Sequence, residues 1–141
     1  MKNAETRPLP ANRILAHIVA AKEVRFDPGP GTHHLREVLN RLEVPAFPCI
    51  ATVDVLVKLS LAEARTEEGE IRIVDEAGQA TFRSPCSVRN VRGTGWPPGC
   101  DLSMRIRFLA EEEGFYAIEA AGADGTWARY PLYIGHTDRR R

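Results

Sequence analysis

Apolar and polar residues alternate along much of this chain. In the stretch Cys49–Leu61, every second residue from Val53 onward is valine or leucine, and mostly polar residues lie between them. The stretch Leu102–Leu109 alternates in the same way, with serine and arginine at its polar positions. Successive side chains of a strand point to opposite faces of its sheet. Both stretches are therefore predicted to be strands with one buried and one wetter face.

A hairpin is predicted near the end of the sequence. Two alternating stretches, Phe115–Gly122 and Thr126–Ile134, are separated by a short turn that contains the step Asp124-Gly125. An Asp-Gly step favours a tight hairpin because glycine adopts a positive φ at little cost. Shorter strands are predicted at Glu70–Asp75, Gln79–Arg83 and, from a weaker pattern, Val88–Val91.

The last predicted strand carries both a proline and an aromatic row. Pro131 cannot donate to a ladder, so this strand is expected to lie at a sheet edge or to be bulged there. Trp127, Arg129 and Tyr133 share the face opposite the apolar one and place two aromatic rings around a guanidinium. This composition is enriched at binding hot spots. Three interpretations stay open: contact with a ligand, self-association, or cover by another part of the chain.

One segment has a helical rather than an alternating pattern. Four leucine and valine residues of Leu35–Val44 recur at positions i, i+3, i+4 and i+7, which is typical of one face of a helix. Thr32 is a suitable capping residue, and Pro45 would end either kind of element. The residue pattern favours a short helix here.

Short strands separated by glycine, proline and aspartate turns predict an all-β fold. The expected architecture is an antiparallel, immunoglobulin-like β-sandwich of about seven or eight strands, with the one short helix. The chain of 141 residues has the length of a single domain. We expect a flexible N-terminal arm at 1–11, the sandwich at 12–135 and a basic tail at 136–141.

Several pieces of this pattern occur together in a known group of proteins. They are the apolar first strand Ile14–Ala21, the Pro-Ala-Phe-Pro step Pro45–Pro48, the alternating strand Val53–Leu61, the turn Ile73–Gly78, and the closing pair Glu113–Tyr116 and Pro131–Ile134. In this combination the chain resembles an uncharacterised bacterial family of small β-sandwich proteins, a domain of unknown function. The resemblance implies a strand where the residue pattern favours a helix, and it implies no activity, cofactor or catalytic residue.

The charge balance excludes some classes of partner. Nineteen Lys and Arg residues balance nineteen Asp and Glu residues. A non-specific nucleic-acid binder needs excess positive charge to displace counterions, and a polybasic membrane-surface protein needs the same excess. The apolar stretch Ile14–Ala21 is far shorter than the roughly 20 residues of a membrane span, and it contains His17. We therefore expect a soluble, cytoplasmic protein with neither nucleic acid nor membrane as a partner.

Cysteine and histidine usage gives little support to a metal or a disulfide framework. Cys49, Cys86 and Cys100 are odd in number and form no CxxC pair, which favours a reducing compartment. A bridge between two of them stays open. His33-His34, on a predicted loop, would need one or two further ligands from afar. His17 is expected to be a core or interface histidine. No metal or other cofactor is predicted.

No pattern for catalysis is found. The chain has no G-x-S-x-G elbow, and Gly93-Thr94-Gly95 lacks the lysine and the helix of a phosphate-binding loop. This segment instead opens the loop Gly93–Gly99, which presents Trp96 between Gly95 and Pro97. An aromatic residue on such a loop forms a contact surface or, alternatively, folds back to plug the end of the sandwich.

The leading hypothesis is therefore a non-catalytic interaction module. It would bind an unidentified protein partner or itself, with Trp96, Trp127, Arg129 and Tyr133 as contact residues. The alternative is a module that binds a small ligand, a carbohydrate or another polar metabolite, through the same aromatic residues. An enzyme is not expected.

Overall fold

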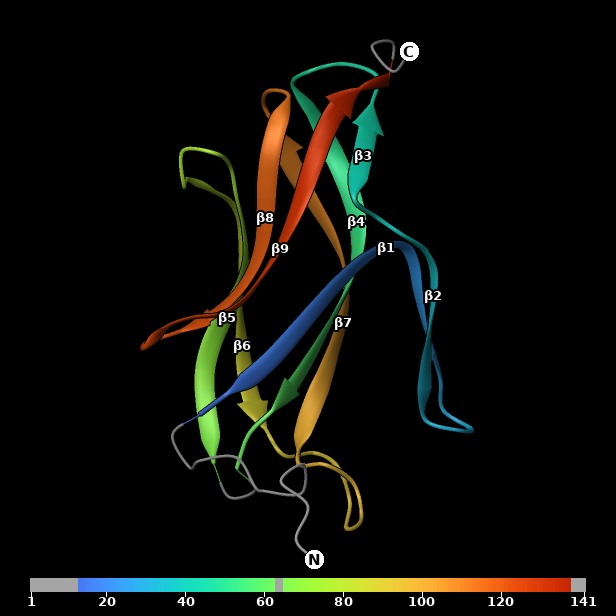
Figure 1. Ribbon diagram of the computed structural model, residues 1–141, viewed down its shortest axis with the longest axis vertical. Helices are drawn as coiled ribbons and strands as arrows, with labels where there is room; N and C mark the ends of the chain where they lie inside the picture. Colours follow the sequence, from blue (N-terminus) through green and yellow to red (C-terminus); the bar gives the residue numbers. More distant parts are fainter. Residues whose placement is uncertain (1–12, 63–64, 138–141) are drawn as a thin grey trace, which may run out of the picture.

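The computed structural model describes residues 13–62 and 65–137, and it arranges them as an all-β fold (Figure 1). Within these ranges it contains no α-helix, and hence no helix that could cross a membrane. The predicted N-terminal arm and most of the basic tail lie outside the described residues. The strands are β1 (Leu15–Asp27), β2 (Thr32–Val38), β3 (Arg41–Val44), β4 (Cys49–Ser60), β5 (Thr66–Val74), β6 (Ala80–Arg89), β7 (Gly99–Ala110), β8 (Gly114–Gly122) and β9 (Gly125–His136).

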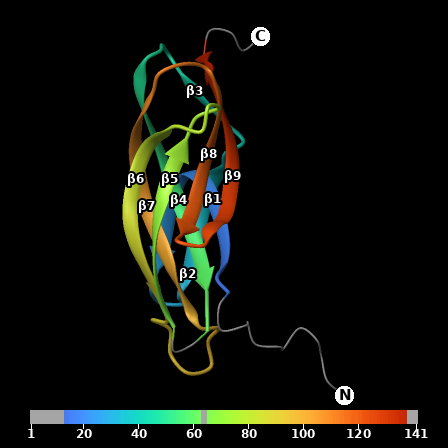
Figure 2. The same ribbon diagram turned by 90° about the vertical axis from the view of Figure 1, so that its left-hand side faces the viewer.

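The strands form two sheets that lie one behind the other in Figure 2. Sheet A has the strand order β2-β1-β4-β7 and is antiparallel throughout. Sheet B has the order β3-β9-β8-β5-β6 and is mixed, because β3 runs parallel to β9. The prediction of an all-β fold is confirmed. The described residues nevertheless form nine strands rather than seven or eight, and one sheet is not purely antiparallel.

The alternation seen in the sequence fills the space between the sheets. Val55, Val57 and Leu59 of β4 are fully buried, as are Ile71 of β5 and Ile134 of β9. Burying each such side chain contributes about 1.5–3 kcal/mol relative to leaving it in water. The two sheets are thus held together mainly by residues that a period of two identifies.

The predicted helix at Leu35–Val44 is wrong. This segment forms the end of β2 and all of β3, joined through Leu39 and Asn40. Leu39 is buried and donates its N–H to the Ala20 carbonyl at 2.8 Å, and the Tyr130 hydroxyl donates to the Leu39 carbonyl. The helical spacing misleads because its apolar residues belong to two strands in different sheets, and Val38 is 53% exposed.

Two further sequence expectations concern β6 and the final hairpin. The separate strands predicted at Gln79–Arg83 and Val88–Val91 are one strand, β6. The hairpin is confirmed: Gly122 pairs with Gly125, whose φ is 123°.

Pro131 lies where β9 has a neighbour on one side only. It pairs with Ala117 of β8, but β3 begins to pair with β9 at Tyr133 and continues to His136. The prediction of an edge position therefore holds for this part of β9, although β3 covers the rest of the strand.

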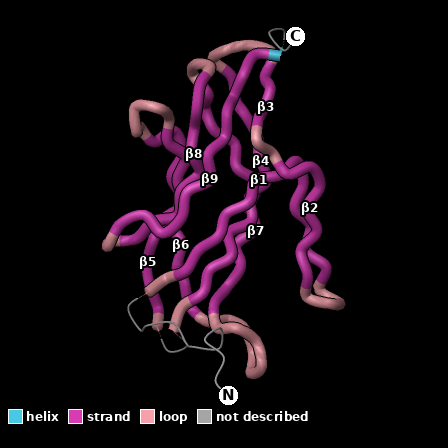
Figure 3. The backbone as a smooth tube through the Cα atoms, in the orientation of Figure 1, coloured by secondary structure: helices cyan, strands magenta, loops and turns pink. Residues whose placement is uncertain are grey.

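Strand β1 serves two purposes along its length. It pairs with β4 as far as Ala21, opposite Asp54, and then continues with β2 alone. Residues 22–38 form a two-stranded extension of sheet A, the projecting hairpin, that points away from β4 and β7 (right-hand side of Figures 1 and 3). Asp54, only 6% exposed, accepts the Val24 N–H at 3.0 Å and Arg105 Nε at 2.8 Å. The hydrogen bond from Arg105 outweighs the effect of burial and lowers the pKa of Asp54.

The substitution Asp54→Asn is expected to lower the free energy of unfolding at pH 7 by about 1–3 kcal/mol, because it removes a charged hydrogen-bond acceptor from a buried site. A carboxyl group with a lowered pKa stabilises the fold above its unfolded pKa, and this stabilisation is lost as the pH falls through the folded pKa. The difference between wild type and variant should therefore shrink in urea unfolding at pH 3. Glu111→Gln, at an exposed loop position, is the control. A loss that is equal at both pH values would contradict the assignment.

Candidate functional site

The three residues of the predicted row, Trp127, Arg129 and Tyr133, do not form one contact surface. Trp127 does not lie on the outer face with the other two. Ala120 pairs with Ala128 and Ala121 with Thr126, so Trp127 is the extra residue of a β-bulge. A bulge re-aims the side chain that it carries.

The Trp127 ring lies over two glycines, Gly69 and Gly122, which face each other across β5 and β8. Both glycines belong to the rows that face the core, and the ring packs against the core cluster. Its Nε1 donates to Asp124 Oδ1 at 3.1 Å. Trp127 is thus engaged within its own chain.

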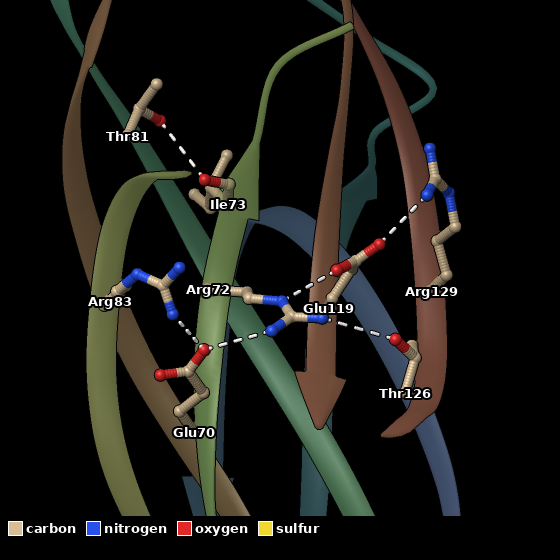
Figure 4. Close-up of polar contacts among 8 residues, drawn as sticks. All are labelled: Glu70, Arg72, Ile73, Thr81, Arg83, Glu119, Thr126 and Arg129. Atoms are coloured by element: carbon tan, nitrogen blue, oxygen red, sulfur yellow. Dashed lines mark hydrogen bonds and ion pairs between the residues drawn. The ribbon is translucent and has the colours of Figure 1, made fainter. Parts of the chain in front are cut away.

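Arg129 belongs to a ladder of charges on the outer face of sheet B (Figure 4). Its Nη1 lies 2.9 Å from Glu119 Oε2, and Arg72 Nε lies 2.8 Å from Glu119 Oε1. Arg72 also pairs with Glu70, which in turn pairs with Arg83. Glu119 is only 6% exposed. The hydrogen bond to Glu119 raises the pKa of Arg72, so this buried carboxylate is matched by two fixed positive charges.

Small apolar residues lie on the same outer face of sheet B as the charge ladder. Val74, Ala117 and Ala121 face outward from sheet B, yet each is at most 7% exposed. Long arginine stems cover apolar neighbours while their charged ends reach water. A shallow hollow of about 300 Å³ borders the ladder at Arg72 and Arg129. Both guanidinium groups are already paired there, which indicates a structural role.

Tyr133 lies in a separate cluster nearer the other end of β9. Phe115 meets its ring edge-on at a centroid distance of 4.9 Å, and Arg41 Cζ lies 4.8 Å from the ring centre. The Tyr133 hydroxyl donates to Glu113 Oε2 at 3.2 Å. Loss of solvent and the neighbouring Glu113 raise the pKa of Tyr133. This half-buried ring has neighbours on several sides.

Trp96 remains accessible: its side chain is 59% exposed and does not fold back into the end of the sheets. Its loop between β6 and β7 is held from within. Arg92 donates through Nη1 to the Pro97 carbonyl and through Nη2 to Asp101 Oδ1, each at 2.8 Å. Asn90 Oδ1 accepts the backbone N–H of Arg92 at 3.0 Å. These bonds fix the loop on both sides of the indole.

Trp96 borders a groove of about 590 Å³ on the outer face of sheet A. His17, Lys58 and Asp101 lie side by side across β1, β4 and β7 and form its floor. Lys58 Nζ lies 3.1 Å from Asp101 Oδ1. Phe26, 51% exposed, contributes from the projecting hairpin. The groove thus combines two exposed aromatic rings with a charged floor.

The histidines lie elsewhere than the sequence suggested. His17 is exposed, so the expected core position is wrong and the interface position stays a prediction; Ala16 and Ile18 take the inward positions on either side of it. His33 and His34 lie on β2 and not on a loop. Among the residues that the structure describes, no three His, Cys, Asp or Glu side chains are placed to share a metal ion.

All three cysteines are free thiols. Cys100 is buried in β7, and Cys86 lies half-buried in β6 against the core. Burial raises the pKa of the Cys86 thiol, which disfavours the nucleophilic thiolate.

Sequence reasoning found Trp96 but not its neighbours in the groove. The alternation of β4 does place Lys58 on the polar face, and that of β7 does so for Asp101. Lys58 and Asp101 lie side by side because β4 and β7 are neighbours in sheet A, and local sequence patterns do not indicate the order of strands in a sheet. The sequence pattern did not indicate Phe26, because its position depends on where β1 ceases to pair with β4.

No family model and no curated protein matches this chain. Among solved structures it is similar to a β-glucosidase from Listeria innocua in complex with glucose, with 7% identity and a TM-score of 0.44 over 87% of this chain. The chain spans 16% of the length of that β-glucosidase. It is also similar to an X-ray structure of a Northeast Structural Genomics Consortium target, SoR45, with 10% identity and a TM-score of 0.33 over 88% of this chain and 83% of that one. Similarities this low carry no argument about function.

The packing of Trp127 can be tested through Gly122. A Cβ added at Gly122 would collide with the Trp127 ring. Gly122→Ala is expected to cost about 1–3 kcal/mol of unfolding free energy, as overpacking does. In the double variant Gly122→Ala/Trp127→Ala the added methyl should cost much less. Chemical unfolding of the four proteins of this cycle measures the coupling. A cost that is the same with and without the indole would show that Trp127 does not cover Gly122.

Proposed function

We propose that the protein is a non-catalytic interaction module built on an immunoglobulin-like β-sandwich. Its contact surface is the groove on the outer face of sheet A, and its partner is a protein. The observation that carries this proposal is the exposed Trp96 on a loop held by Arg92, beside a second exposed ring, Phe26.

A fixed, exposed tryptophan is well suited to anchor a partner. Hot spots of protein interfaces are enriched in tryptophan, tyrosine and arginine. A side chain whose loop is already ordered loses less conformational entropy on binding. The ion pairs that join Lys58 and Arg92 to Asp101 supply directional polar contacts at the groove floor. Because these ionisable groups pair with one another, the floor suits recognition better than proton transfer.

A carbohydrate or another polar metabolite is the second candidate ligand. The specific observation in its favour is the polar floor of Lys58, Ser60 and Asp101 beside an aromatic platform. The groove volume of about 590 Å³ is within the range of roughly 300–1,000 Å³ that small-molecule sites occupy.

The wider assignment rests on the sequence. We propose membership of the uncharacterised bacterial β-sandwich family, a cytoplasmic location and a single domain at 12–135. The balance of nineteen basic and nineteen acidic residues supports partners other than nucleic acid or a membrane surface.

Trp96→Ala is expected to weaken binding of a protein partner at least tenfold, since truncating a hot-spot residue typically costs about 2 kcal/mol or more. A photo-crosslinker placed at position 94 first captures the partner, which is then purified and titrated calorimetrically against each variant. Phe115→Ala is a matched control, because Phe115 is also 59% exposed but lies on β8 and does not line the groove. Equal affinity of Trp96→Ala and wild type would rule out the groove as the contact surface.

The second candidate has its own readout. The chain has two tryptophans, so Trp127→Phe leaves Trp96 as the single indole fluorophore. Titration of this variant with a panel of oligosaccharides should shift the emission of Trp96 for a true ligand, and Lys58→Ala should abolish the shift. Emission that stays constant across the panel would argue against a carbohydrate ligand.

A further inference from the structure

Strand β2 forms an open edge of sheet A. It pairs with β1 on one side, and no described strand pairs with it on the other. Six of its seven residues are exposed, including Leu35 at 39% and Val38 at 53%. Figure 1 shows the projecting hairpin extending away from β4 and β7. An exposed edge strand presents backbone donors and acceptors that another strand can bind.

The backbone groups that face this edge follow from one hydrogen bond. Val24 donates its N–H to Asp54 of β4, on the side of β1 away from its cross-strand partner Leu35. In an antiparallel ladder the two residues of such a pair both direct their N–H and C=O groups away from each other. Leu35 therefore presents both groups to the open edge. By alternation, His33 does the same.

We propose that β2 pairs with β2 of a second copy of this chain. The two strands run antiparallel about a two-fold axis at His34, which places His33 of each copy opposite Leu35 of the other. The N–H and C=O groups of these residues then form four backbone hydrogen bonds between the copies. This interface uses the strand edge and not the Trp96 groove, so it goes beyond the proposed function.

A second copy fits this edge in charge as well as in geometry. The projecting hairpin carries three positive side chains and three negative ones: Lys22, Arg25 and Arg36, and Glu23, Asp27 and Glu37. Arg36 pairs with Glu23 and Glu37 within one chain, at 3.2 and 3.1 Å. Two such hairpins therefore meet without net like charge, and each brings the exposed Leu35 to the contact.

Glu37 limits how far the two strands can pair. Its φ of 55° lies in the left-handed region and interrupts the extended backbone after Arg36. The paired segment is thus confined to Thr32–Arg36, which is symmetric about His34. Because both copies use the same edge, pairing consumes it and closes the assembly as a dimer.

Leu35→Pro tests the interface directly. Proline removes the N–H that faces the open edge, whereas no bond to β1 uses that N–H. Leu35→Ala is the matched control, since it shortens the side chain and keeps the N–H. By light scattering after size exclusion, wild type and Leu35→Ala should have twice the mass of one chain, and Leu35→Pro the mass of one. A wild-type monomer at millimolar concentration, or a Leu35→Pro dimer, would overturn the proposal.

A cross-linking pair tests the register without proline. Residues facing each other at a two-fold axis in a pair that is not hydrogen-bonded have Cα atoms about 4.5 Å apart, within the range of a disulfide. His34→Cys should therefore form a covalent dimer on mild oxidation. Arg36→Cys should not, because four residues of offset separate the two thiol positions by about 13 Å. Wild type, with its three native cysteines, sets the background. Equal cross-linking of the two variants would refute this register even if Leu35→Pro failed to fold.

Discussion

The buried carboxylate of Asp54 is the contact on which the shape of sheet A depends. A strand that leaves its sheet exposes backbone donors at the point of departure, and an unpaired buried N–H is costly. Asp54 accepts the Val24 N–H where β1 separates from β4, and Arg105 holds the carboxylate in its charged form. This lets β1 extend beyond the sheet as the projecting hairpin. This extension places Phe26 at the groove, and it provides the strand with which β2 pairs to form the open edge.

The opposite sheet is stabilised by a different arrangement. Tyr130 reaches from β9 to the Leu39 carbonyl, where the chain crosses from β2 to β3, and so ties the crossover to the core. On the outer face, Glu119 lies between Arg72 and Arg129 above outward-facing alanines. Breaking such a pair by removing one partner leaves a buried charge uncompensated. The charged groups of Arg72, Arg129 and Glu119 are thus engaged within sheet B, whereas the outer face of sheet A carries the groove beside Trp96.

The parts of the fold that the sequence predicts are those decided by local alternation. The cores of β4, β7, β8 and β9 are predicted from a period of two, and the Asp124-Gly125 turn from its residue types. Leu35–Val44 failed because its helical spacing combines residues of two sheets. Trp127 failed because a single bulge moves a residue from one face to the other, and no pattern of side chains shows a bulge. Trp96 was found from its Pro/Gly loop alone, while the floor beneath it needs the strand order of sheet A.

The projecting hairpin reconciles two opposing demands. To line the groove, the hairpin must extend away from β4 and β7. An exposed strand edge of this kind can pair with strands of other chains. Ion pairs among Lys22, Arg36 and Glu37 place charge along the hairpin. The left-handed φ of Glu37 ends the segment of β2 that can pair with another strand, so that no long, flat edge is left open. A short symmetric edge of this kind favours pairing with one equal edge over continued sheet growth, because pairing saturates every backbone group that it exposes.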